Sequence, residues 1–131
     1  MIVETSALMA ILLREPERET FLVAIQADPD PWLSAANYVE AGVVVDRLGD
    51  PTRSRLLDEL VESLGIRIEP VTVEQARTAR AAHRDFGRAS GNRARLNFGD
   101  TFGYALAVTT GEPLLFKGDD FRETDVRRAL P

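Results

Sequence analysis

The chain has 131 residues, 16 basic and 21 acidic side chains, a formal net charge of −5 and no cysteine. We expect a single domain over residues 1–131, because this length suits one hydrophobic core and the apolar fraction of 44% can build it. The lack of cysteine excludes disulfides, thiolate metal sites and a cysteine nucleophile, and it fits a cytoplasmic protein. Because His83 is the only histidine, cleavage of a phosphodiester by two imidazoles and a multi-histidine metal site are also excluded.

Export and membrane insertion are not expected. The longest apolar run covers residues 7–13, whereas a membrane-spanning helix needs roughly 20 residues. The first residues also lack the basic lead of a signal peptide.

The predicted secondary structure alternates between short strands and helices. Apolar stretches bounded by turn residues predict four strands, at residues 1–3, 32–34, 66–69 and 113–116. Apolar residues at helical spacing predict six helices, at residues 7–12, 21–25, 36–48, 56–64, 73–86 and 100–110. Ser6 is expected to cap the first helix. Helices between successive strands imply a mostly parallel sheet of four or five strands with helices on both faces, an α/β/α sandwich.

Acidic side chains are expected to gather at one edge of this sheet. Ligands collect at the carboxyl ends of parallel strands; Glu4 follows the first strand, and Asp119 and Asp120 follow the last. Asp100 begins one helix, and Glu40 could join from another.

Two carboxylates about 4 Å apart repel by roughly 4 kcal/mol at an effective dielectric constant near 20. Such a cluster needs protons or divalent cations at neutral pH, and oxygen ligands favour Mg²⁺ or Mn²⁺.

Glu40 is expected to have apolar surroundings. Ala36, Val43 and Val44 are its neighbours at helical spacing, so an ionised carboxylate there needs a hydrogen-bond donor or a cation. Asn37, three residues earlier, could orient it. The ordinary alternative is an ion pair with a distant arginine.

The other acidic residues also have ordinary explanations when each is taken alone. Asp100 could complement the positive end of its helix. Asp119 and Asp120 follow Gly118 and are common turn residues. Glu4 at a strand end is uninformative by itself. Their joint placement is what favours a function.

Four segments carry a family resemblance: residues 2–8 (IVETSAL), 34–40 (SAANYVE), 96–100 (LNFGD) and 114–121 (LLFKGDDF), with residues 124–126 (TDV) fitting as well. In this order they resemble PIN-domain nucleases and, more closely, the VapC-type toxins of bacterial toxin–antitoxin pairs. The resemblance extends over nearly the whole chain. It implies an α/β/α PIN fold, a Mg²⁺- or Mn²⁺-dependent endoribonuclease, a cognate VapB-type antitoxin and a homodimer.

Carried over by position, Glu40 and Asp100 match catalytic acidic residues of the family. The fourth acidic position falls on Asp119 or Asp120, and the sequence does not decide between them. The family usually has aspartate where this chain has Glu4. One extra methylene moves a carboxylate by about 1.5 Å, beyond the roughly 0.5 Å tolerance of a preorganised metal site. Glu4 therefore supports the fold more firmly than it supports full activity.

Together these residues suggest metal-assisted hydrolysis of RNA. One or two ions would be held by Glu4, Asp100 and either Asp119 or Asp120, while Glu40 would hold a water molecule or act as the base.

Further side chains could support this site. Thr5, Ser6 and Asn37 could hydrogen-bond the carboxylates, although helix capping is the more common role of Ser6. Lys117 could contact a phosphate, and an exposed turn lysine is the frequent alternative.

An acidic protein needs a local basic surface to bind RNA. Residues 77–95 contain six arginines, of which Arg93 and Arg95 come shortly before the LNFGD segment. The alternative is a solvated helix face, and His83 is expected to be a bystander.

Several apolar residues have two possible uses. Phe98 and Tyr104 could stack on bases, but core packing is favoured for both. The early helices could supply an antitoxin groove, although plain core use is again favoured, through Leu8, Ile11, Leu12, Phe21 and Leu22.

Two other classes of protein remain open. A response-regulator receiver has a similar length, a parallel sheet, an acidic magnesium pocket and a late lysine, but its phosphoacceptor aspartate should end a middle strand. Residues 66–70 offer no such aspartate. A catalytically silent binding module is the other alternative, motivated by Glu4.

Overall fold

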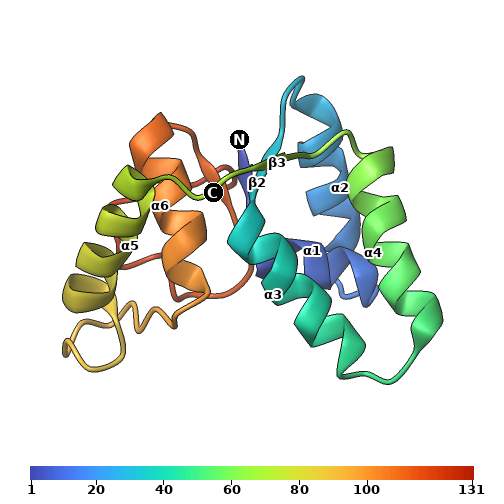
Figure 1. Ribbon diagram of the computed structural model, residues 1–131. Helices are drawn as coiled ribbons and strands as arrows, with labels where there is room; N and C mark the ends of the chain where they lie inside the picture. The colour runs from blue at the N-terminus through green and yellow to red at the C-terminus, as the bar shows by residue number, and fades with distance from the viewer.

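A four-stranded parallel sheet lies between two groups of helices, with α1 to α4 on one side and α5 and α6 on the other (Figure 1). The computed structural model describes residues 1–131. The strands are β1 (Ile2–Val3), β2 (Trp32–Ser34), β3 (Arg67–Glu69) and β4 (Leu114–Leu115). The helices are α1 (Thr5–Leu12), α2 (Arg18–Ala27), α3 (Ala35–Asp46), α4 (Pro51–Ser63), α5 (Val73–Phe86) and α6 (Asp100–Thr110). The predicted α/β/α arrangement is confirmed, with four strands. None of the helices has the length and apolar character needed to cross a membrane.

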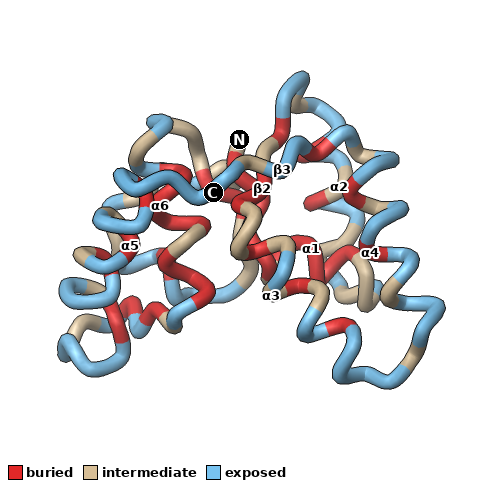
Figure 2. The backbone as a smooth tube through the Cα atoms, viewed as in Figure 1, coloured by how far each residue is buried: buried red, intermediate tan, exposed pale blue.

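Successive side chains along the strands belong to two separate hydrophobic cores, one on each face of the sheet. Val3, Leu33 and Leu115 belong to the cluster that α1 to α4 complete. Ile2 and Leu114 belong to the cluster that α5 and α6 complete. Because successive residues of a strand point to opposite faces, even two-residue strands bind a helical layer on each side. Buried backbone accordingly follows the sheet and the helix faces turned toward it (Figure 2).

The strand order is β3-β2-β1-β4 and every pairing is parallel. Ile2 lies beside Trp32 on one side and Leu114 on the other, so the strands are nearly level. Their carboxyl ends therefore lie at one edge, where β1 leads into Glu4, β2 into α3, and β4 into Phe116 and the following turn. Gly118 has φ +93°, a left-handed conformation that favours glycine and lets the chain turn sharply there.

Several element boundaries differ from those predicted. α1 begins at Thr5 and its cap is Glu4, so the prediction that Ser6 caps this helix is wrong. α4 begins at Pro51 rather than near Leu56, because Asp50 accepts the N–H of Thr52 and proline suits the first helical position. Polar residues fill this first turn, so the apolar spacing did not reveal it.

Candidate active site

Glu4 follows β1 directly and is almost completely buried, with 2% of its surface exposed. Its Oε2 accepts hydrogen bonds from the Ser6 N–H, at 2.7 Å, and from the Ser6 hydroxyl. The same hydroxyl accepts the backbone N–H of Lys117 at 2.9 Å. Ser6 thus joins the end of β1 to the end of β4 and fixes the Glu4 carboxylate between them.

Glu40 extends from α3 to the start of α6 and lies among polar groups. Its Oε2 accepts hydrogen bonds from the Thr5 hydroxyl at 2.6 Å and from Asn37 Nδ2 at 3.1 Å. The apolar surroundings predicted for Glu40 are wrong, because Val43 and Val44 are 43% and 36% exposed and its neighbours are polar donors. Asn37 Nδ2 also donates to the Gly99 carbonyl at 3.0 Å, which ties α3 to the start of α6.

Asp100 is the first residue of α6 and is 7% exposed. Its Oδ2 accepts the N–H of Asn97 at 2.7 Å, and its own N–H donates to Asn97 Oδ1 at 2.9 Å. This reciprocal pair satisfies two backbone groups at the helix start, as in a capping box. Asp100 therefore has the ordinary helix-start role considered for it, in addition to its position beside the other acids.

Burial and mutual repulsion raise the pKa of two of these carboxyl groups. Desolvation raises the pKa of Glu4 to about 7, and the charges of Asp100 and Glu40 add to the effect although the Ser6 hydrogen bonds oppose it. Desolvation likewise raises the pKa of Asp100 to about 6, with Asp120 and Glu40 adding to it and the Asn97 N–H and Arg88 opposing it. Glu4, Glu40, Asp100 and Asp120 therefore share one electrostatic environment. At neutral pH this acidic cluster favours a proton or a cation.

The two aspartates of the β4 turn are both exposed, but their charged neighbours differ. Asp119 has an 88% exposed side chain, and its Oδ1 lies 2.9 Å from Nε of Arg122. Asp120 is the one whose charge raises the pKa of Asp100. Of the two candidates for the fourth acidic position, the electrostatics favour Asp120 over Asp119.

The profile of the PIN domain matches residues 1–127. The chain belongs to the PIN-domain family. It is 53% identical to Ribonuclease VapC28 of Mycobacterium tuberculosis over 130 residues, which cover 99% of this chain and 98% of that protein. The predicted resemblance to VapC-type proteins is thereby confirmed.

Solved structures of toxins share the fold. Mycobacterium tuberculosis VapC20, a toxin that cleaves the sarcin–ricin loop, matches with a TM-score of 0.73 at 17% identity, covering 96% of this chain and 98% of that one. A toxin–antitoxin complex from Klebsiella pneumoniae matches with a TM-score of 0.68 at 17% identity, with coverages of 95% and 92%. At these identities the likeness establishes the fold alone.

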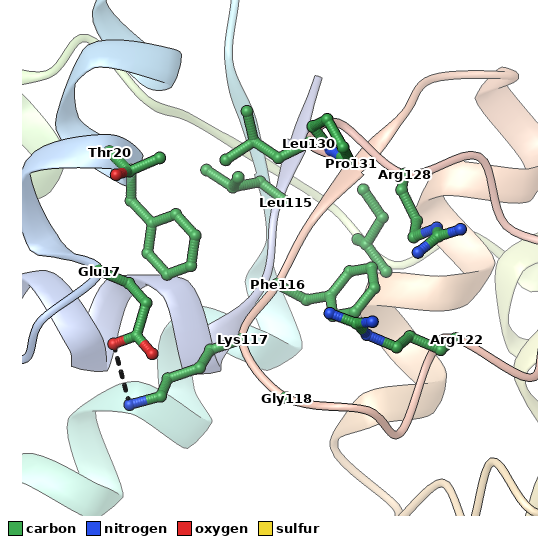
Figure 3. Close-up of a pocket in the computed structure, with 12 residues that line it drawn as sticks. Glu17, Thr20, Leu115, Phe116, Lys117, Gly118, Arg122, Arg128, Leu130 and Pro131 are labelled. Atoms are coloured by element: carbon green, nitrogen blue, oxygen red, sulfur yellow. Dashed lines mark ion pairs between the residues drawn. The ribbon is translucent and has the colours of Figure 1, made fainter.

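The ammonium group of Lys117 forms ion pairs with two acidic side chains of this PIN domain. Its Nζ lies 2.7 Å from Glu15 Oε2 and 3.1 Å from Glu17 Oε2, and hydrogen bonding to them raises its pKa. Figure 3 shows the Glu17 pair at one side of a pocket beside β4, with Arg122 and Arg128 on the other side. The structure therefore gives Lys117 an ion-pair role in place of the phosphate contact considered for it.

A basic loop, residues 88–95, contains Arg88, Arg93 and Arg95 and lies next to the acidic cluster at Asp100. Arg88, one of the six arginines of the predicted basic surface, is close enough to Asp100 to lower its pKa. Arg93 and Arg95 are exposed and make no ion pair. Phe98 is 76% exposed, so its predicted core packing is wrong, whereas Tyr104 is buried as predicted.

The carboxylates of this PIN domain are the type of ligand that a hard divalent cation prefers. Glu4, Glu40 and Asp100 each accept all of their side-chain hydrogen bonds on one oxygen, which leaves the second oxygen without a protein donor. Free carboxylate oxygens are ligands that Mg²⁺ and Mn²⁺ prefer. No three acidic side chains are gathered as a complete ligand set, so the fit rests on donor chemistry and charge.

Proposed function

We propose that this PIN domain is a toxin ribonuclease that hydrolyses RNA phosphodiester bonds internally, with Mg²⁺ or Mn²⁺, and is neutralised by a VapB-type antitoxin. The observation that carries this function is the cluster of coupled carboxylates, in which the buried Glu4 and Asp100 have pKa values raised to about 7 and 6. Buried carboxyl groups with raised pKa values and no ion pair are candidates for a functional site. The relationship to Ribonuclease VapC28 supports RNA as the substrate.

The residues divide the chemistry among them. Glu4, Asp100 and Asp120 would hold the cation, which when bound polarises the scissile phosphate and favours ionisation of water. Glu40 would accept the proton of the attacking water, which forms a bond to phosphorus as the bond to the leaving sugar oxygen breaks. Thr5 and Asn37 hold Glu40 by hydrogen bonds, and Ser6 holds Glu4.

RNA would approach over the basic loop. The protein is net acidic, so long-range repulsion must be offset where the substrate binds. Arg88 lies next to Asp100, and Arg93 and Arg95 have guanidinium groups free of acidic partners. These arginines, in place of Lys117, would bind the phosphates that flank the cleaved bond.

The antitoxin would dock between α1, α2 and α4. Ile11, Leu12, Leu56 and Leu60 line a shallow hollow there, although Ile11 itself is buried in the core. Arg14 and Arg18 at its edge suit an acidic segment of the partner. The likeness in fold to a toxin–antitoxin complex from Klebsiella pneumoniae supports an antitoxin as the partner.

A homodimer is proposed from a separate apolar surface. Val39 is 62% exposed and Val43 is 43% exposed on α3, and Phe98 is 76% exposed before α6. Apolar side chains exposed in this way favour contact with another protein surface. Sedimentation of the purified toxin would show whether a dimer forms.

The test of the ribonuclease is cleavage of total RNA with and without Mg²⁺, beside Glu40→Gln. Loss of the general base should slow cleavage by about 10²- to 10⁴-fold. Equal cleavage by the wild-type protein and the variant would contradict the role of Glu40. Uptake of phosphate from acetyl phosphate would instead indicate a receiver, and antitoxin binding without any cleavage would indicate a silent module.

Glu4 is proposed to attenuate this activity. Its longer side chain turns back so that Oε2 accepts the Ser6 N–H, whereas an aspartate can accept the same N–H and would present its second oxygen from nearer the strand. Glu4→Asp should therefore raise the cleavage rate, by about tenfold. A rate that falls in Glu4→Asp would show that this site is adapted to glutamate.

A further inference from the structure

The backbone dihedral angles of Gly99 do not require glycine. Its φ of −64° and ψ of −42° are right-handed helical values that any L-residue adopts. Some other feature of the site must therefore make a side chain at position 99 unfavourable.

The Glu40 carboxylate occupies the place of the missing side chain. A Cβ on Gly99 would lie 1.7 Å from Glu40 Oε1 and 2.2 Å from Glu40 Cδ. Such separations are far inside van der Waals contact, so the carboxylate and a Cβ cannot coexist. By contrast, a Cβ on Gly42, in the same helix as Glu40, would have nothing within 4 Å.

The remaining contacts hold Glu40 in this place. Thr5 and Asn37 both donate to Oε2, and Asn37 Nδ2 also donates to the Gly99 carbonyl. Oε1 is left against the α-carbon of Gly99 without a protein donor. Asn37 thus binds the Glu40 carboxylate and the Gly99 backbone with one amide group.

We propose that Gly99 is a positioning residue, whose lack of a side chain creates the space that holds the Glu40 carboxylate beside Asp100. This inference rests on the proposed ribonuclease function for its catalytic consequence. Its structural part, the displacement of Glu40 by any Cβ at position 99, stands independently.

The test is Gly99→Ala, with Gly42→Ala as a matched control. Because a Cβ at position 99 meets the far end of the flexible Glu40 side chain, Gly99→Ala should fold with the wild-type circular dichroism spectrum, while RNA cleavage should fall by about 10²-fold through misplacement of the base. Gly42→Ala should cleave within about twofold of wild type. In the Glu40→Gln background, Gly99→Ala should cause little further loss, because both changes act through the same carboxylate.

A second measurement needs no RNA. The side-chain amide resonances of Asn37 in a ¹H–¹⁵N spectrum should shift in Gly99→Ala, which disturbs the bond to Glu40, and should not shift in Gly42→Ala. Unshifted Asn37 resonances, or wild-type cleavage by Gly99→Ala, would overturn the inference. Shifted resonances in a protein that cleaves no RNA even as wild type would uphold the displacement of Glu40 and contradict the ribonuclease instead.

Discussion

Two turns at the same edge of the sheet carry carboxylates in opposite environments. The turn after β1 places Glu4 in a site where 2% of its surface is exposed and only Ser6 donates to its carboxylate. The turn after β4 leaves the Asp119 side chain 88% exposed and paired with Arg122. Both residues follow parallel strands that lie side by side, so their place in the topology is equivalent.

The difference shows that a strand end locates a candidate acid but does not make it a functional one. The Asp119 carboxylate is hydrated and paired with a cation, so its charge lowers the stability of the folded protein little. Glu4 is desolvated near Asp100 and Glu40, and its pKa rises to about 7. A carboxylate kept in such a place at a cost in stability is the stronger indication of a binding or catalytic role.

The largest expected effect concerns the pH dependence of stability in EDTA. The pKa of Glu4 is about 7 in the folded protein against 4.5 ordinarily, so its contribution is full below pH 4.5 and is lost as the pH rises through 7. The free energy of unfolding should therefore fall between pH 5 and 8, by up to about 3 kcal/mol from this group. Denaturant unfolding of wild type and Glu4→Gln at both pH values measures the difference.

Glu4→Gln keeps an acceptor for Ser6 and loses the charge, so its unfolding free energy should depend less on pH. Asp119→Asn serves as the control from the other turn and should follow the wild-type slope. Parallel slopes for wild type and Glu4→Gln would mean that the Glu4 carboxylate is better solvated than its burial indicates.

The next effect separates the neighbours Asp119 and Asp120. Asp120 shares the electrostatic environment of Asp100, and Asp119 is paired with Arg122 outside it. Asp120→Asn should lower the cleavage rate by about 10- to 100-fold, whereas Asp119→Asn should stay within about twofold of wild type. Initial rates on one labelled RNA at saturating Mg²⁺ measure both. A larger loss in Asp119→Asn would return the fourth acidic position to that residue.

Much of the fold was predictable because it depends on local patterns. The apolar strands, the helical spacing and the glycine ends of α5 and α6 fix the order of elements, and the crossover rule then makes the sheet parallel. That rule also brought Glu4, Asp100 and the β4 turn to one edge. The predicted start of a helix was wrong where a polar capping residue lets the helix begin before its first apolar residue, as Asp50 does for α4.

The candidate site was less predictable because its contacts join segments far apart in the sequence. Glu40 meets Thr5 across 35 residues, and Asn37 meets Gly99 across 62 residues, which no spacing reveals. Lys117 was assigned to phosphate because Glu15 and Glu17 are distant in sequence. Gly99 was part of a recognised segment, but its contact with Glu40 requires three-dimensional coordinates.

The smallest expected effect tests Lys117, whose ammonium group lies between Glu15 and Glu17. Lys117→Met should change RNA cleavage by less than about twofold and should change stability little, because these partly exposed ion pairs are screened by solvent. The salt dependence of RNA binding distinguishes this from a phosphate contact. Each lost contact with single-stranded RNA should reduce the slope of log affinity against log salt by about 0.7. Arg93→Met should show that reduction and Lys117→Met should not, since a cation already neutralised by two carboxylates releases no counterion from RNA. A reduced slope for Lys117→Met would mean that RNA displaces Glu15 and Glu17, and that the β4 turn contacts the substrate after all.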